Sequence, residues 1–381
     1  MKGNKAPAAL ALIIALALSA ASCADRRCPS ESKIRKLYRH SRDYNETAAF
    51  LAGTRVRPGT PLFRLTQTDG YRAYRESIGS LWEQYRKRDL DNIETWRRTH
   101  IRSVSGVIMY PFSGPDILNA LAFFPRAEEF VMIGLEDPGS APDPFAFRGV
   151  AVLGELWRVK TALRTILQLN LFRTQEMHAD LKPESFSSIT GIMMFFLARY
   201  GYDILDVKRV YVDRAGALAE WDPRSSGRDA EGVEIIFRKG AGAPLQTARF
   251  FSIDLSDSSL SHKRGFSAFL GGKRQFTTFI KSASYLLSYD TFTVLRSYLL
   301  AGSAYLVQED SGIPMKYFTD GQWKISLHGT YRLLPIFANR FQQDLDAAIK
   351  SRSEGLLPFS FGYGFDPEKS NIMIAVPMAR N

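Results

Sequence analysis

The chain has 381 residues, of which 45% are hydrophobic and 12% aromatic, and this composition excludes a mainly disordered protein. The net charge of +11 is concentrated near the beginning, because residues 23–102 hold 18 basic and 10 acidic residues whereas residues 103–381 are almost balanced. After residue 22, no apolar run is long enough to cross a bilayer as a helix.

The first 22 residues have the pattern of a secretory signal peptide. Lys2 and Lys5 form a basic start, residues 8–18 are continuously apolar, and four small residues precede Cys23. This ending resembles the lipobox of bacterial lipoproteins. The resemblance implies cleavage before Cys23 and attachment of lipid, of the palmitate kind, to its sulfur. The alternatives are an ordinary cleavable signal followed by a chance cysteine, and an uncleaved anchor.

The signal peptide and the lipobox-like ending together predict that the protein is located in the cell envelope. Cys28 is the only other cysteine, so an acylated Cys23 leaves the mature chain without an internal disulfide. We therefore expect a membrane-anchored lipoprotein on the periplasmic side or at the cell surface. The basic residues of 23–102 would adhere to anionic lipid headgroups, although a solvated helical surface explains them equally well. A nucleic-acid partner is not expected of an exported protein.

Four consecutive segments are predicted: a signal peptide over 1–22, a tether over 23–32, a basic helical segment over 33–102 and an α/β domain over 103–381. In the helical segment, apolar and aromatic residues at helical spacing predict a long helix over 71–99. Asp69 is a candidate cap for it. An aromatic stripe of this kind is more often packing than a ligand site.

The clearest unit of the chain lies between Val104 and Ser140. A strand over 104–110 is followed by a tight turn, a short helix over 116–124, a second strand over 130–135 and a polar loop. Both strands are apolar on both faces, which is typical of a central strand covered on each side. Since sites in open α/β sheets form at the carboxyl ends of strands, Ser113, Asp116 and Glu136 are expected to share one rim.

Helices and strands alternate through the remainder of the chain, which favours an α/β fold with a mixed, mostly buried sheet flanked by helices and preceded by an N-terminal helical segment. The predicted helices are 152–167, 186–200, 277–287, 291–300 and 341–350. The predicted strands are 207–212, a hairpin of 233–237 with 246–253, then 304–307, 324–327 and 372–376. The polar, glycine-rich stretch 256–274 is predicted to be a mobile loop.

Candidate catalytic residues come from the same rim. Ser113 follows a strand and precedes a helix, and it is the best position for a nucleophile, with Glu136 and His178 as partners in a hydrolase-type site. His328 is an alternative base and Asp310 an alternative orienting acid. The competing interpretation is that Ser113 only caps the helix. Tyr110, Asp116 and Asp310 are the candidate binding residues.

No cofactor or metal is expected. The five histidines show no metal-ligand spacing, and neither a P-loop nor a dinucleotide-binding glycine pattern follows a strand. Two further stretches are candidates for binding. Residues 308–314 place two acids beside a turn, and residues 359–365 interleave aromatic and small residues that could stack on a sugar ring. Turn chemistry and the edge of the core are the simpler explanations of both stretches.

The stretches Tyr110-Pro-Phe-Ser-Gly-Pro-Asp116, Gly134-Leu-Glu136, Asp310-Ser-Gly-Ile-Pro314 and Gly362-Tyr-Gly364 together resemble a family of uncharacterised bacterial lipoproteins, over most of residues 100–381. The resemblance implies no known activity. Two hypotheses follow: a ligand-binding or structural envelope module, or an envelope hydrolase with its site around Ser113 and Glu136.

Overall fold

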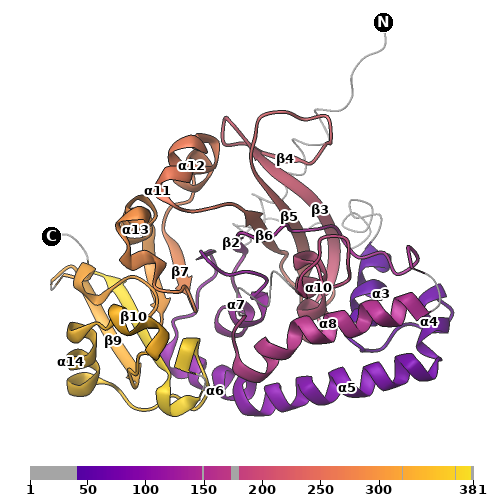
Figure 1. Cartoon of the computed structure of the whole chain (residues 1–381), viewed down its shortest axis with the longest axis horizontal. Coiled ribbons are helices and arrows are strands. Elements are labelled where there is room, and N and C mark those ends of the chain that lie inside the picture. Colours follow the sequence, from indigo (N-terminus) through magenta and orange to yellow (C-terminus); the bar gives the residue numbers. More distant parts are fainter. Residues whose placement is uncertain (1–40, 148–149, 173–179, 320, 365, 379–381) are drawn as a thin grey trace, which may run out of the picture.

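The computed structural model describes residues 41–147, 150–172, 180–319, 321–364 and 366–378 (Figure 1). Within these ranges the strands form one ten-stranded sheet in the order β4-β3-β5-β6-β2-β1-β7-β8-β10-β9. The predicted class, a mixed and mostly buried sheet flanked by helices, is confirmed. The strands are β1 Val107–Tyr110, β2 Glu129–Gly134, β3 Asp203–Asp213, β4 Leu218–Glu220, β5 Arg228–Arg238, β6 Gln246–Ser252, β7 Phe276–Ile280, β8 Ser303–Gln308, β9 Trp323–Gly329 and β10 Asn371–Pro377.

The sheet has a parallel centre and antiparallel margins. Strands β6, β2, β1, β7 and β8 run parallel. On one margin β3, β4 and β5 are antiparallel, and on the other β9 and β10. The predicted hairpin of β5 and β6 joins the first margin to the centre. All five central strands therefore direct their carboxyl ends to one edge of the sheet.

Helices cover both faces, and the central strands supply side chains to each. Ile108 and Tyr110 of β1 belong to one hydrophobic cluster, and Met109 between them belongs to the other. The first face is covered by α3 Ser41–Leu51, α5 Asp69–Tyr85, α6 Asp91–His100, α7 Ile117–Phe123, α8 Val150–Leu169 and α10 Ile189–Arg199. The second is covered by α11 Asp257–His262, α12 Arg264–Gly271, α13 Thr293–Gly302 and α14 Gln343–Arg352.

The predicted long helix is present, but its centre is distorted. Helix α5 continues through a π-helical turn, η2 (Arg86–Leu90), into α6, so the run is helical from Asp69 to His100. Its cap is Thr68, whose hydroxyl accepts a hydrogen bond from Tyr71 N, and not Asp69. A short helix, α4 (Pro61–Thr66), lies in the connection before it.

The described part of the basic helical segment packs into the same core as the sheet. Tyr71 and Tyr74 of α5 are buried, and their hydroxyls donate to Phe50 O and Leu51 O of α3. Asn45 of α3 hydrogen-bonds both ways with the backbone of Ile204 on β3. Helices α5 and α8 lie side by side along the first face (Figure 1).

Two secondary-structure predictions are wrong. Residues 277–287 are not a helix, because Phe276–Ile280 forms β7, buried between β1 and β8. Residues 256–274 are not a loop, because α11 and α12 form there: Ser256 caps α11, and Phe266 and Leu270 of α12 are buried against the sheet. In both cases tertiary neighbours decide the local conformation.

The described residues include no helix with the length and apolar character needed to span a bilayer. The signal peptide, Cys23 and the tether lie outside the described residues.

Candidate functional site

The neighbouring strands β1 and β7 mark the point in the sheet where the chain connections reverse: one continues from β1 to β2 on one side, the other from β7 to β8 on the opposite side. From β1 the chain passes through α7, on the first face, to β2; from β7 it passes through α13, on the second face, to β8. The connections leaving the two neighbouring strands therefore diverge. Ligands of open α/β sheets characteristically bind at such a point, outside the carboxyl ends of the strands.

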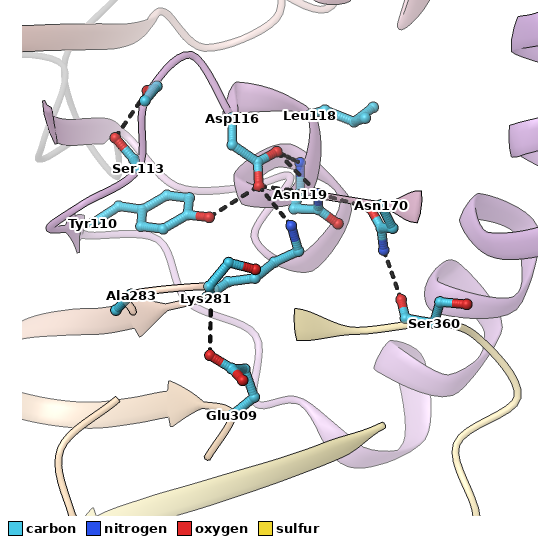
Figure 2. A network of polar contacts seen from close by, with 12 residues as sticks. Tyr110, Ser113, Asp116, Leu118, Asn119, Asn170, Lys281, Ala283, Glu309 and Ser360 are labelled. Carbon is cyan, nitrogen blue, oxygen red and sulfur yellow. Dashed lines mark hydrogen bonds and ion pairs between the residues drawn. The ribbon is translucent and has the colours of Figure 1, made fainter. Parts of the chain in front are cut away.

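A buried ion pair occupies this position. Figure 2 shows the side chains of Tyr110, Asn119 and Lys281 converging on the Asp116 carboxylate. Lys281 Nζ lies 3.0 Å from Asp116 Oδ2, and the Tyr110 hydroxyl donates to the same oxygen at 2.9 Å. The Asp116 and Lys281 side chains are only 3% and 1% exposed. Such a pair persists only when other hydrogen bonds complete it.

Asn119 supplies those hydrogen bonds and extends the network. Asp116 is the N-cap of α7: its Oδ1 accepts from the Asn119 backbone at 3.0 Å and from Asn119 Nδ2 at 2.9 Å. Asn119 Nδ2 also donates to Asn170 Oδ1 at 2.9 Å, and Asn170 Nδ2 donates to Ser360 O at 2.6 Å. The network thus joins β1, α7, the end of α8 and the segment before β10. We call Tyr110, Asp116, Asn119 and Lys281 the Asp116–Lys281 centre.

Two consecutive buried acids, Glu309 and Asp310, follow β8, which lies next to β7 in the sheet. Glu309 Oε1 accepts hydrogen bonds from Ser282 N at 2.9 Å and from the Ser311 hydroxyl. Asp310 accepts from the Tyr285 hydroxyl and, at 2.7 Å, from Asn371 Nδ2. Burial, together with the neighbouring Asp310 charge, raises the pKa of Glu309 to about 8. Burial also raises the pKa of Asp310.

Backbone strain is concentrated in the two loops that flank this region. Phe112, after β1, has φ 58°, and Ser282, Ser284 and Tyr285, after β7, have φ values of 55°, 51° and 56°. The left-handed region is unfavourable for residues with a Cβ, and such residues cluster at ligand clamps and active sites. The strain therefore marks the ends of β1 and β7 as a candidate functional region.

Ser113 is near this region but is fully engaged by the backbone. Its Oγ accepts from Ile133 N at 3.1 Å and lies 3.0 Å from Gly114 O, and Ser113 N donates to Ile133 O at 2.8 Å. Ser113 therefore ties the turn after β1 to β2. It is not the cap of α7, since Asp116 holds that position.

The other proposed catalytic residues do not join Ser113. Glu136 is partly exposed, and its Oε2 accepts from Leu135 N at 3.1 Å; no hydrogen bond links it to Ser113 in the described ranges. His178 lies outside the described residues. His328 is on β9, four places from β1 in the strand order, where it contacts Trp96 and His100. Its burial lowers its pKa. Of the predicted binding residues, Tyr110 and Asp116 meet in the Asp116–Lys281 centre, and Asp310 lies beside Glu309.

An open cleft lies at the same edge of the sheet, at the ends of β2 and β6. Its volume is about 320 Å³, and we call it the carboxyl-edge cleft. It is lined by Asp137, Pro138, Arg228, Asp229, Ala230, Glu231, Ser252 and Lys263. Asp137 and Pro138 belong to the polar loop predicted after β2, whereas the other lining residues come from β5, β6 and the start of α12.

Ion pairs fix most of the charges in the cleft. Glu231 lies 3.0 Å from both Arg209 and Arg228, and Arg209 also lies 3.9 Å from Asp137. Asp229 Oδ2 accepts from Gly265 N at 2.6 Å, at the start of α12. Lys263 has no ion-pair partner among the residues that the structure describes. Across the same residues, no group of three or more His, Cys, Asp or Glu side chains is placed to hold a metal ion.

Sequence reasoning missed Lys281, Glu309 and Lys263. Lys281 was missed because its strand was predicted as a helix, although the run Phe-Thr-Thr-Phe-Ile is rich in β-formers and is followed by Lys-Ser. Glu309 was noticed only as one of two acids beside a turn. No family model, curated protein or solved structure matches the chain.

Proposed function

We propose that the chain is a lipid-anchored cell-envelope protein whose α/β body binds a small polar ligand in the carboxyl-edge cleft. The observation that carries this proposal is the cleft itself, an open space of about 320 Å³ at the carboxyl ends of parallel strands. That volume is within the range of small-molecule sites. The lining residues come from β5, β6, the loop after β2 and the start of α12, so the sheet itself positions most of them.

The charges of the cleft favour a ligand that carries both signs. Lys263 offers an ammonium group that has no ion-pair partner among the described residues, and Asp137 offers a carboxylate that lies 3.9 Å from Arg209, whereas Glu231 is already paired with Arg209 and Arg228. A zwitterion, such as an amino acid, can pair with both at once. A strongly anionic ligand would be repelled by the acids of the cleft, and a strongly cationic ligand would be repelled by Lys263 and Arg228.

The hydrolase alternative has less support. A nucleophilic hydroxyl must be free to attack and must have a base within hydrogen-bond reach. Ser113 Oγ is instead held by the backbone of Ile133 and Gly114. The described residues place neither Glu136 nor His328 against it.

The cleft is tested by comparing two lysines. Free amino acids are titrated into the full chain, and binding is followed by calorimetry. Lys263→Ala should weaken the binding of any amino acid that binds the wild type, because it removes the unpaired cation. Lys324→Ala, an exposed lysine on the far strand β9, is the matched control and should bind normally. Equal binding by both variants would place the site elsewhere.

The anchor is tested separately. Its support is the pattern of Lys2, Lys5, the apolar run and Cys23. Cys23→Ser should release the protein from membranes and abolish metabolic labelling with palmitate, while Cys28→Ser should leave both unchanged. Labelling that persists in the Cys23 variant would overturn the anchor.

A further inference from the structure

Arg214 lies between two segments that line the carboxyl-edge cleft. It belongs to the turn between β3 and β4, and its Cα is 2.8 Å from the position that a Cβ would take on Gly265. Its side chain runs past Gly227, where the corresponding position is 3.4 Å from Arg214 Nε. Gly227 precedes the lining residue Arg228. Gly265 follows Lys263, which also lines the cleft, by two positions. Arg214 is therefore a neighbour of both segments.

Arg214 and Lys263 carry positive charges that can be reached from solvent. Arg214 is exposed and Lys263 is partly exposed, and neither forms an ion pair with an acid in the ranges that the structure describes. Arg224, on the loop between β4 and β5, differs from them because its guanidinium lies 3.3 Å from Asp222. The β3–β4 turn and the start of α12 thus supply the cations of the cleft that are available to a ligand.

Three acids near these cations are already engaged within the protein. Asp213 accepts two backbone hydrogen bonds of the β3–β4 turn, at 2.8 Å and 2.9 Å. Asp229 accepts one from the backbone at the start of α12, at 2.6 Å, and Glu231 is paired with two arginines. The side chain of Asp137 is 49% exposed and lies 3.9 Å from Arg209. Asp137 is therefore the acid of the cleft that is most open to a ligand.

We propose that the ligand of the carboxyl-edge cleft is an acidic amino acid, whose two carboxylates bind Arg214 and Lys263 and whose ammonium group binds Asp137. This inference rests on the proposed function, because it names the class of zwitterion that the cleft takes. Two available cations and one available acid match a ligand with two negative charges and one positive charge. The arginine can hold a carboxylate through two parallel hydrogen bonds, and the lysine acts as a point charge. A neutral amino acid leaves one cation without a partner, and a basic amino acid is repelled by both.

Calorimetry on the full chain in detergent, with ligands that differ by one charged group, tests the proposal. L-glutamate is compared with L-glutamine and glutarate, and L-aspartate with L-asparagine and succinate. At least one acidic amino acid should bind about tenfold more tightly than its amide and its analogue without the ammonium group, because each analogue loses one charge-assisted interaction. Arg214→Gln should abolish the preference for the acid over its amide. Arg224→Gln removes the same charge from a neighbouring loop and should keep the preference.

Asp137→Asn gives an independent readout of the ammonium contact. It should narrow the difference in affinity between the acidic amino acid and its analogue without the ammonium group, since the contact that separates them is weakened. The proposal is overturned if an amide or a dicarboxylate binds as tightly as the acidic amino acid, or if Arg214→Gln keeps the wild-type preference. In these cases the cleft still takes an amino acid or another small polar ligand, and the proposed function stands. If no amino acid and no dicarboxylate binds at all, both proposals fail together.

Discussion

Lys281 Nζ lies 3.0 Å from Asp116 Oδ2 although the two residues are 165 positions apart in the chain. The contact joins the loop after β7 to the first turn of α7, at the point where the chain changes direction in the sheet. Breaking a buried pair on one side leaves an uncompensated charge, and this cost exceeds the value of the pair itself.

Lys281→Met should therefore lower the free energy of unfolding by about 3–5 kcal/mol. The exposed pair of Arg72 and Asp69, with side chains 55% and 96% exposed, provides the control. Arg72→Met should cost less than about 1 kcal/mol. Urea denaturation followed by circular dichroism measures both. A Lys281 variant as stable as the Arg72 variant would contradict the role of the buried pair.

Stability should decline with rising pH because of Glu309. The folded state raises the pKa of this carboxyl from 4.5 to about 8, so between these values the unfolded chain has released a proton that the native protein retains. Fewer protons bound in the unfolded state means that stability is lost as pH rises, by up to about 1.4 kcal/mol per unit. The raised pKa of Asp310 acts in the same direction.

Glu309→Gln isolates this contribution, because glutamine does not titrate. The difference in unfolding free energy between wild type and variant, measured from about pH 5 to pH 8, should change in favour of the variant as pH rises. A constant difference over this range would show that Glu309 ionises as an ordinary carboxyl.

Ser113→Ala should affect stability and not ligand binding. The substitution leaves the buried Ile133 N–H without its hydrogen-bond acceptor, at a cost of about 1–3 kcal/mol. Ser261→Ala, at an exposed serine of α11, should be nearly neutral. Thermal unfolding and amino-acid titration measure the two effects. A stable Ser113 variant that has lost an esterase or amidase activity of the wild type would instead favour the hydrolase.

Gly362→Ala should be unusually costly for a glycine substitution. Gly362 has φ 65°, and a Cβ added there would lie 2.5 Å from Glu309 Oε2 and 2.6 Å from Glu309 Cγ. Gly240 also has positive φ, at 84°, but a Cβ there meets nothing within 4 Å. Gly240→Ala should therefore cost only about 1 kcal/mol, the backbone contribution. The excess loss at Gly362, read by urea denaturation, measures how tightly the Glu309 carboxyl is packed.

The sequence predicted the parts of the fold that depend on local periodicity. The continuously apolar runs of β1 and β2, the stripe of α8 and the all-round apolar α10 are visible in the residue order, because burial on one or both faces repeats with the period of the element. The candidate binding residues Tyr110 and Asp116 do meet, whereas no hydrogen bond in the described ranges joins Ser113 to Glu136, which were expected to share one rim with Asp116.

The contacts that define the candidate sites could not be predicted in this way. Phe276–Ile280 is short, and its apolar pattern is compatible with a helix or a strand; only the hydrogen bonds offered by β1 and β8 make it β7. The position of Lys281 beside Asp116, and of Ser282 beside Glu309, follows from that pairing.

The residue order alone predicted the α/β class, and it alone carries the patterns on which the proposed export and acylation rest, since each is a pattern within a short stretch or a repeating period. The tertiary structure alone decided which charges are buried together and which carboxyl has a raised pKa. Burial and proximity are properties of residues far apart in the chain, and they exist only after the strands have paired.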